Sequence, residues 1–151
     1  MHLISYISDS ALCHGKMRSE VNNIVKTSQK NNADRGITGV LFFANNYFFQ
    51  TIEGEKEELF DLYETIKQDD RHLEVRTLID QPVRERAFGN WSLDGFFVDN
   101  HELINPHTIS MLQSIYAHNF GVDASGLIEF VKRMIDEMDT FKILKDPHQY
   151  Q

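Results

Sequence analysis

Residues 36–54 read GITGVLFFANNYFFQTIEG, and this stretch decides the fold. It holds two apolar runs, Val40–Phe43 and Tyr47–Ile52, which are rich in the β-branched and aromatic residues that favour strands. The pair Asn45-Asn46 separates them, and asparagine tolerates a positive φ angle. The stretch therefore predicts a tight β-hairpin, whose second strand we expect near the centre of a sheet.

An amphipathic helix is predicted on each side of this hairpin. Spacing of the form i, i+3, i+4, i+7 places side chains on one face of a helix. Before the hairpin this spacing is shown by Val21, Ile24, Val25 and Ser28. After the hairpin it is shown by Leu59, Leu62, Tyr63 and Ile66. We expect the first helix to end near Asn31-Asn32, because asparagine is a weak helix former and a good cap.

Three further strands are predicted outside the helices. They span His2–Ser8, Val75–Ile79 and Trp91–Val98, where apolar, β-branched and aromatic residues predominate. The order is then β-α-β-β-α-β-β. This order predicts an α+β class, ferredoxin-like fold, in which two split βαβ units place both helices on one face of a sheet.

The pattern changes near residue 101. Apolar stripes predict one helix over 106–118 and a second over 127–138. We therefore divide the chain into a domain of residues 1–100 and a C-terminal two-helix extension of residues 101–151. The extension is too short for a convincing domain of its own, so we expect it to cap the bare sheet face or to form an oligomer or partner interface.

Composition excludes several classes of protein. The 151 residues carry 15 Lys plus Arg against 23 Asp plus Glu, a formal charge of −8, which disfavours binding to nucleic acid or to anionic membranes. The single cysteine, Cys13, excludes an internal disulfide framework. We find neither an apolar run of about 18 residues nor a signal peptide. We expect an acidic cytoplasmic protein.

No enzyme class emerges from the motifs. The seven histidines show neither HExxH nor a Cys-x-x-Cys companion, so a zinc site is disfavoured. Cys13 and His14 are adjacent, and adjacent side chains do not generally converge as a nucleophile and base. Glycine-rich phosphate-binding motifs are absent as well. We predict no catalytic residues and no enzymatic activity.

Polar residues within elements that should be buried carry a stronger signal. They are Tyr6, Ser28, Asn31, Asn32 and Gln50. A buried amide or phenol without a partner costs roughly 1–3 kcal/mol. Each residue could pair locally, the two asparagines as helix caps and Gln50 with backbone. Together they could instead line a pocket for a flat heteroaromatic ligand, and composition and spacing leave both possibilities open.

Five motifs in order resemble one known family. They are Ser28–Asn32, Gly36–Gly39, Phe48–Glu55, Asp70–His72 and Trp91-Ser92, preceded by a Tyr-x-Ser at Tyr6. This pattern strongly resembles the BLUF family of blue-light sensors using flavin, over about residues 2–98. The resemblance agrees with the element order above and implies that residues 1–100 form a flavin-binding photosensor domain.

The resemblance also implies a cofactor and its contacts. FAD, for which FMN or riboflavin could substitute, would lie with its ring between the two helices. Tyr6, Gln50 and Trp91 would be the photochemical residues on neighbouring strands. The cofactor-binding residues would be Ile24, Ser28, Asn31, Asn32, Ile66, Arg71 and His72. For Ile24 and Ile66, a role as ordinary core residues buries the same surface.

The residue types suit a photochemical switch. A tyrosine can give an excited flavin an electron and then a proton, and the amide of Gln50 holds an acceptor and two donor hydrogens. By rotation or tautomerisation this amide could exchange partners and shift the flavin absorption slightly to the red. Ser92 and Leu93 would form the signal strand, although most members carry methionine where this chain has Leu93. Trp91 could alternatively act as an anchoring aromatic.

The resemblance finally suggests how the signal leaves the domain. We expect the short BLUF type, which lacks an enzymatic output domain and signals by light-dependent protein–protein association. The expected partners are flavin, further copies of this chain in a homo-oligomer, and an unidentified downstream protein. The alternative is a ferredoxin-like flavin-binding or interaction domain that is not photoactive.

Overall fold

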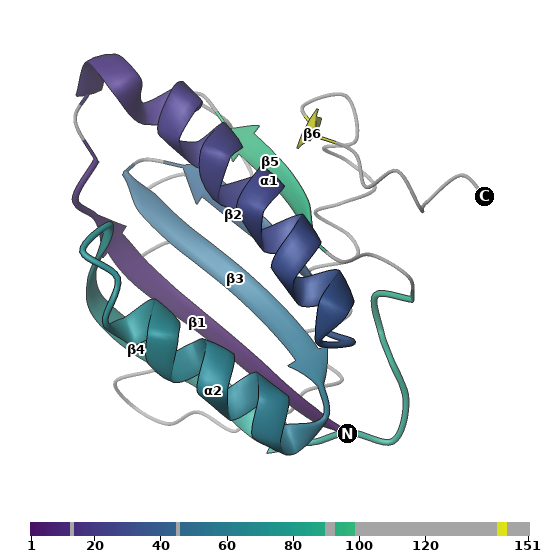
Figure 1. Ribbon diagram of the computed structural model, residues 1–151. Coiled ribbons are helices and arrows are strands. Elements are labelled where there is room, and N and C mark those ends of the chain that lie inside the picture. The colour runs from purple at the N-terminus through teal and green to yellow at the C-terminus, as the bar shows by residue number, and fades with distance from the viewer. Residues whose placement is uncertain (13, 45, 90–92, 99–141, 145–151) are drawn as a thin grey trace.

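The computed structural model describes residues 1–12, 14–44, 46–89, 93–98 and 142–144. Within these residues, six strands form one sheet in the order β4-β1-β3-β2-β5-β6 (Figure 1). Their bounds are β1 (His2–Ser10), β2 (Thr38–Ala44), β3 (Tyr47–Gly54), β4 (His72–Pro82), β5 (Asp94–Val98) and β6 (Lys142–Leu144). The helices predicted over 106–118 and 127–138 lie outside the described residues, as do Trp91 and Ser92.

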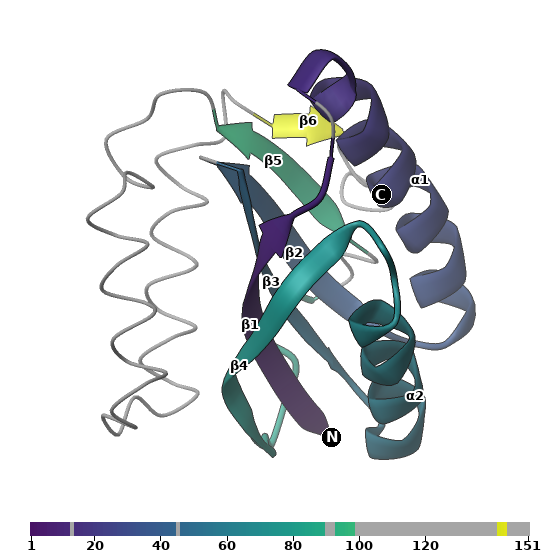
Figure 2. The ribbon, with the colours of Figure 1, turned by 90° about the vertical axis from the view of Figure 1, so that its left-hand side faces the viewer.

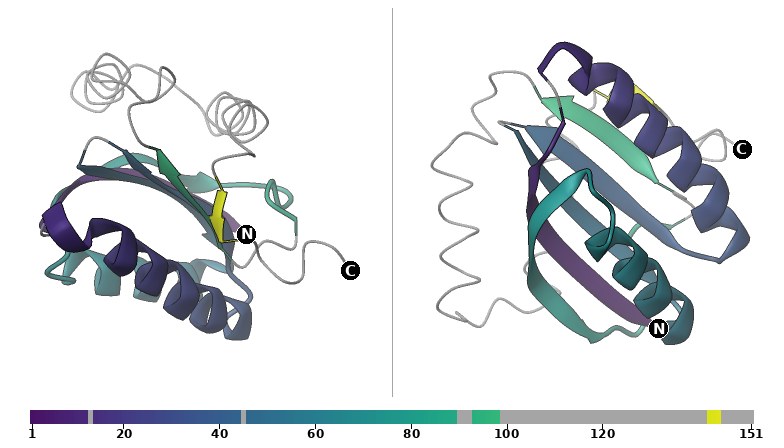
Figure 3. Two further views of the ribbon diagram at one scale, coloured as in Figure 1. Left: turned by 90° about the horizontal axis from the view of Figure 1, so that it is seen from above. Right: turned by 60° about the vertical axis from the view of Figure 1, so that its left-hand side comes forward.

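Two α-helices, α1 (Met17–Asp34) and α2 (Lys56–Lys67), pack against the same face of the sheet (Figure 3). A short 3-10 helix, η1 (His14–Lys16), leads into α1. Helix α1 ends two residues later than predicted, because Asn32 is buried within the helix rather than capping it. The backbone turns at Gly36, where φ is +66°.

The connections between strands explain why both helices share one face. Strands β1 and β2 are parallel to each other, and β3 lies between them, antiparallel to both. Strands β3 and β4 enclose β1 in the same way. Both β-α-β crossovers are expected to be right-handed, and because they run in opposite directions they place α1 and α2 on one side. The predicted ferredoxin-like order is confirmed.

The hairpin between β2 and β3 forms as its sequence predicts. Asn46 adopts a left-handed conformation with φ of 65°, as tight hairpin turns require. Gly39 pairs with Ile52 across the hairpin, and a Cβ added at Gly39 would lie 2.3 Å from the Thr51 carbonyl oxygen. The hairpin therefore needs a glycine at this position for close approach of its two strands.

The core on the helix face is divided into two clusters. Beneath α1 the cluster consists of Val21, Ile24, Val25, Leu41, Phe43, Phe48 and Leu93. Beneath α2 the cluster consists of Ile4, Tyr6, Ile37, Ile52, Leu59 and Tyr63. In the side view both helices lie on the same side of the sheet, one beyond the other (Figure 2). Alternation along the strands places Leu3, Ile7, Val40, Phe42 and Phe49 on the opposite face, where they are also buried.

Strand β6 was not predicted from the sequence. Lys142–Leu144 pairs antiparallel with β5, with Leu144 opposite Gly95 and Lys142 opposite Phe96. Three residues are too few to display the period-two alternation by which strands are recognised. We expected residues 101–151 to be entirely helical, and at this position they are not. The edge of β5 is thus paired with a segment from near the end of the chain.

Candidate functional site

A pocket opens between α1 and α2, where the two core clusters separate. Its empty space, counting the open mouth, is about 390 Å³. We call it the interhelix pocket. It is lined by Ile24, Ser28, Asn32, Leu41, Gln50, Leu62, Ile66, Asp69, Arg71 and His72. Apolar side chains from both helices therefore share one pocket with amide, hydroxyl, imidazole and charged groups.

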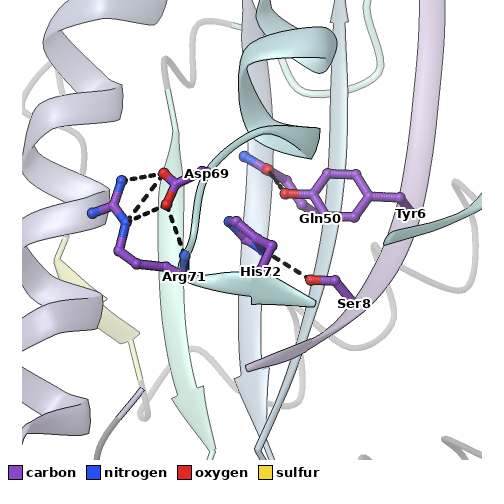
Figure 4. Close-up of polar contacts among 6 residues, drawn as sticks. All are labelled: Tyr6, Ser8, Gln50, Asp69, Arg71 and His72. Atoms are coloured by element: carbon purple, nitrogen blue, oxygen red, sulfur yellow. Dashed lines mark hydrogen bonds and ion pairs between the residues drawn. The ribbon is translucent and has the colours of Figure 1, made fainter. Parts of the chain in front are cut away.

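Tyr6 and Gln50 face each other beneath this pocket. They are direct partners in the β1–β3 register, and the Tyr6 hydroxyl donates a hydrogen bond to Gln50 Oε1 (Figure 4). Tyr6 is fully buried and Gln50 is 5% exposed. Burial raises the pKa of the Tyr6 phenol well above its usual value, and the neighbouring Tyr63 and Asp69 act in the same direction. The phenol is thus a neutral donor, and the amide is its acceptor.

His72 lies beside this pair at the start of β4. Ser8 Oγ and His72 Nδ1 are 2.8 Å apart, which ties the end of β1 to β4 (Figure 4). The imidazole packs on the rings of Tyr6 and Phe48, with centroid separations of 6.0 and 4.4 Å. Burial lowers the pKa of His72 to about 4, so the ring is neutral at neutral pH. The pocket floor therefore consists of neutral hydrogen-bonding groups.

An ion pair between Asp69 and Arg71 lies in the turn just before β4, at one wall of the pocket. Arg71 Nε donates to Asp69 Oδ1 at 2.9 Å, and the Arg71 backbone N–H donates to the same oxygen at 2.9 Å. These hydrogen bonds hold the pKa of Asp69 below its ordinary value, and the same contact raises the pKa of Arg71. Both groups are therefore charged, and the turn between α2 and β4 is fixed by its own side chains.

The structure brings together most of the predicted site residues. Ile24, Ser28 and Asn32 line the pocket from α1, and Ile66 lines it from α2. Asn31, by contrast, is exposed on α1 and is not a lining residue. The following predicted residues line the pocket as well: Gln50, Arg71 and His72. Tyr6 is not itself a lining residue, but its hydroxyl group is hydrogen-bonded to Gln50, which is.

The predicted signal strand is only partly described, because Trp91 and Ser92 lie outside the described residues. Leu93 is fully buried in the cluster beneath α1. Its side chain therefore packs on the helix face of the sheet, in one cluster with residues of α1.

Sequence reasoning missed three lining residues, Leu41, Leu62 and Asp69. Leu62 was recognised as part of the α2 stripe, but helical spacing alone cannot distinguish a core residue from a pocket wall. Asp69 could have been found, since an aspartate in a turn often accepts a hydrogen bond from the backbone N–H of the residue two positions later. No local signal marks Leu41, because its neighbours in the pocket come from other elements.

The residues of the interhelix pocket fit a flat heteroaromatic ligand. Ile24 and Ile66 approach from different helices, as a planar ring held between apolar surfaces requires. Asn32 and Gln50 offer donors and acceptors suited to the nitrogen- and oxygen-rich edge of such a ring. Within the described ranges, histidine, cysteine and carboxylate side chains form no group of three that could hold a metal ion.

A comparison with protein families identifies the ligand class. The family described as sensors of blue-light using FAD matches residues 1–94, more than half of the chain. The chain belongs to the BLUF family. Its cofactor is FAD, and the domain is a blue-light sensor. The family assignment suggested by the sequence motifs is therefore confirmed.

Relatives with known roles share this domain. Photoactivated adenylate cyclase subunit beta from Euglena longa is 37% identical over 91 residues, which are 60% of this chain and 10% of that protein. The blue light- and temperature-regulated antirepressor BluF from Escherichia coli is 30% identical over 83 residues, 55% of this chain and 21% of that protein. The chain thus spans a small part of these curated relatives.

A solved structure resembles nearly the whole chain. The photo-activated state of BlsA superposes with a TM-score of 0.68 and 26% identity, covering 89% of this chain and 95% of that one. No helix among the described residues has the length and apolar character needed to cross a membrane.

Proposed function

We propose that Tyr6 and Gln50 form the light-driven switch of this BLUF sensor, and that the interhelix pocket holds the FAD ring. The observation that carries this proposal is the hydrogen bond from a buried phenol to a buried amide that also lines the pocket. A tyrosine that is able to lose an electron and a proton is thus joined to a group with both acceptor and donor ends.

The proposed binding residues come from both helices and from the start of β4. Ile24 and Ile66 would hold the faces of the ring, while Ser28 and Asn32 would bind its polar edge from α1. Arg71 would lie near the same edge, and His72 would line the site from the start of β4. We retain Asn31 as a proposed neighbour of Asn32 at the outer side of the site, in keeping with its exposure.

The proposed switch uses few atoms of the protein. When bound, FAD supplies the absorption of blue light and an oxidant for the phenol. Tyr6 would donate an electron to the bound flavin, and its hydroxyl proton would move along the existing hydrogen bond towards the Gln50 amide. Gln50 would then rotate or change tautomer, and Tyr6 would recover its electron and its proton. The result is a new hydrogen-bond arrangement reached without any bond to the cofactor.

The proposed output is a light-dependent change in protein–protein association, with no reaction catalysed by the chain itself. Residues 101–151 would serve as a cap on the sheet face opposite the helices or as the interface with a partner. The burial of Leu3, Ile7 and Phe42 on that face supports a cap, since both described α-helices lie on the other side. We propose a homo-oligomer, an unidentified downstream protein and a cytoplasmic location.

The experiment is an absorption spectrum before and after blue light for the wild type, for Gln50→Leu and for Gln50→Asn. The wild type should be yellow with a reversible red shift. Gln50→Leu should bind flavin but show no shift, because leucine fills the volume of the amide without its donor and acceptor. Gln50→Asn is the control for side-chain length, because it keeps the amide and shortens the side chain by one methylene group. An unchanged red shift in Gln50→Leu contradicts the proposed switch, and a yellow wild type without any shift contradicts photoactivity.

A further inference from the structure

One hydrogen bond joins α1 to the residue that precedes β5. Gln29 Nε2 donates to the Leu93 carbonyl oxygen at 2.8 Å, across 64 positions of sequence. Gln29 directly follows Ser28, a lining residue of the interhelix pocket. Leu93 directly precedes the first residue of β5. The bond thus links the helix that forms one wall of the pocket with the beginning of a strand outside it.

Leu93 does not belong to the strand pairing between β2 and β5. Pairing between β2 and β5 begins at Val40 and Asp94, one residue further along the chain. The amide of Gln29 therefore binds the carbonyl group at the point where the strand enters the sheet. A side chain from α1, rather than a neighbouring strand, fixes this entry point.

Helix α1 and strand β5 also pack with little free space. Leu93 is fully buried in a cluster with Val21, Ile24 and Val25 of α1. A Cβ added at Gly95 would lie 2.5 Å from Val25 Cγ2, so the helix rests directly on the strand backbone. Ile24 belongs both to this cluster and to the lining of the pocket. A displacement of α1 is therefore transmitted to β5 by contact.

We propose that Gln29 is a positioning residue that couples the pocket wall on α1 to β5. Its hydrogen bond holds the Leu93 backbone in the register of the dark state, and rearrangement at the pocket changes that bond. The side chain of Leu93 cannot form a hydrogen bond, so Leu93 contributes to this coupling through its backbone carbonyl oxygen. The coupling passes from Ser28 and Ile24, which line the pocket, to Gln29, which binds Leu93, and to Val25, which packs on Gly95. This inference rests on the switch proposed for Gln50.

The test compares three substitutions at Gln29. Gln29→Met has nearly the same length but no donor, Gln29→Glu places an acceptor opposite the carbonyl group, and Gln29→Lys restores a donor. Lys30→Met, at an exposed neighbouring position of α1, is the matched control. Light-minus-dark infrared spectra report on strand backbone, visible spectra report the red shift, and hydrogen exchange in the dark reports on the amides of Asp94–Val98.

Gln29→Met and Gln29→Glu should keep the red shift but lose most of the strand part of the infrared difference signal. Exchange of the β5 amides in the dark should rise by roughly three- to tenfold, the factor expected from loss of one neutral hydrogen bond. Gln29→Lys should restore both quantities towards the wild type, and Lys30→Met should change neither. A role in stability alone would leave the infrared difference signal intact.

Two results would overturn the inference. One is an unchanged strand signal in Gln29→Met and Gln29→Glu, and the other is a loss in Gln29→Lys equal to that in Gln29→Met. Failure of the proposed switch is distinguishable from failure of this inference. It would appear as a persistent red shift in Gln50→Leu, whatever the Gln29 variants show.

Discussion

Two buried polar residues on β3, Gln50 and Glu53, lie three positions apart and differ in how they are held. Gln50 faces the helices, and among the described residues its side chain has one hydrogen-bond partner, Tyr6. Glu53 faces the other side of the sheet and is fully buried. Its carboxyl group accepts hydrogen bonds from the hydroxyl of Thr38 and from the backbone N–H groups of Ala87 and Phe88, each at 2.8 Å.

The difference separates a group that can change partners from one that cannot. A carboxyl group with three donors loses several interactions at once if it moves, and each lost interaction leaves a buried group unsatisfied. An amide with one partner on the wall of a pocket can rotate at the cost of a single hydrogen bond. We infer that β3 combines a rigid anchor, which fixes the connection between β4 and β5, with a switchable residue.

Loss of the anchor should have the largest effect. We expect Glu53→Leu to lower the free energy of unfolding by about 3–5 kcal/mol, because the hydroxyl of Thr38 and two backbone N–H groups lose their acceptor. Urea denaturation followed by circular dichroism measures this change. Glu53→Gln keeps one acceptor oxygen and should lose about half as much. A loss below about 1 kcal/mol in Glu53→Leu would show that Glu53 is not an anchor.

The next effect is a dependence of stability on pH that arises at His72. Its pKa is about 4 in the folded protein and about 6.5 when unfolded, so the unfolded state binds a proton first as the pH falls. Stability from the neutral imidazole is fully present above pH 6.5 and is lost between about pH 6.5 and 4. The total is on the order of 3 kcal/mol.

Denaturation at a series of pH values measures this contribution. His72→Gln keeps hydrogen-bonding capacity towards Ser8 but cannot titrate, so its stability should fall less steeply than that of the wild type over this interval. Equal slopes for the two proteins would contradict the assignment to His72. The result would also show whether the region beside Gln50 tolerates a charge.

The smallest expected effect concerns Tyr63, which packs against the ring of Tyr6 at a centroid separation of 5.5 Å. Tyr63 Oη and Thr77 Oγ1 are 2.6 Å apart. Tyr63→Phe removes this hydrogen bond and keeps the ring, so stability should fall by about 1 kcal/mol. Thermal unfolding measures this change, with Thr77→Val as the control for the other partner. Additive losses in the double variant would show that the two hydroxyl groups do not interact.

The fold could be predicted from the sequence, and so could most of the residues that line the interhelix pocket. Helical and strand periodicities gave the β-α-β-β-α-β-β order, and the turn residue Asn46 adopts the expected positive φ. The order of elements then implied which helices share a face. The three residues of β6 lacked any usable pattern, since their pairing depends on a distant strand. Asn31 is exposed and Asn32 is buried because α1 extends past both residues, so their side chains point in different directions from the helix.

The sequence by itself determined the elements of this BLUF domain, because hydrophobic periodicity, turn residues and family motifs are all carried by neighbouring positions. The tertiary structure decided which partners the polar groups have. From sequence, Gln50 could have paired with backbone, and its bond to Tyr6 spans 44 positions. The contacts of Glu53 and Gln29 bridge similar distances along the chain. Such pairings depend on how strands register and helices pack, which no local pattern encodes.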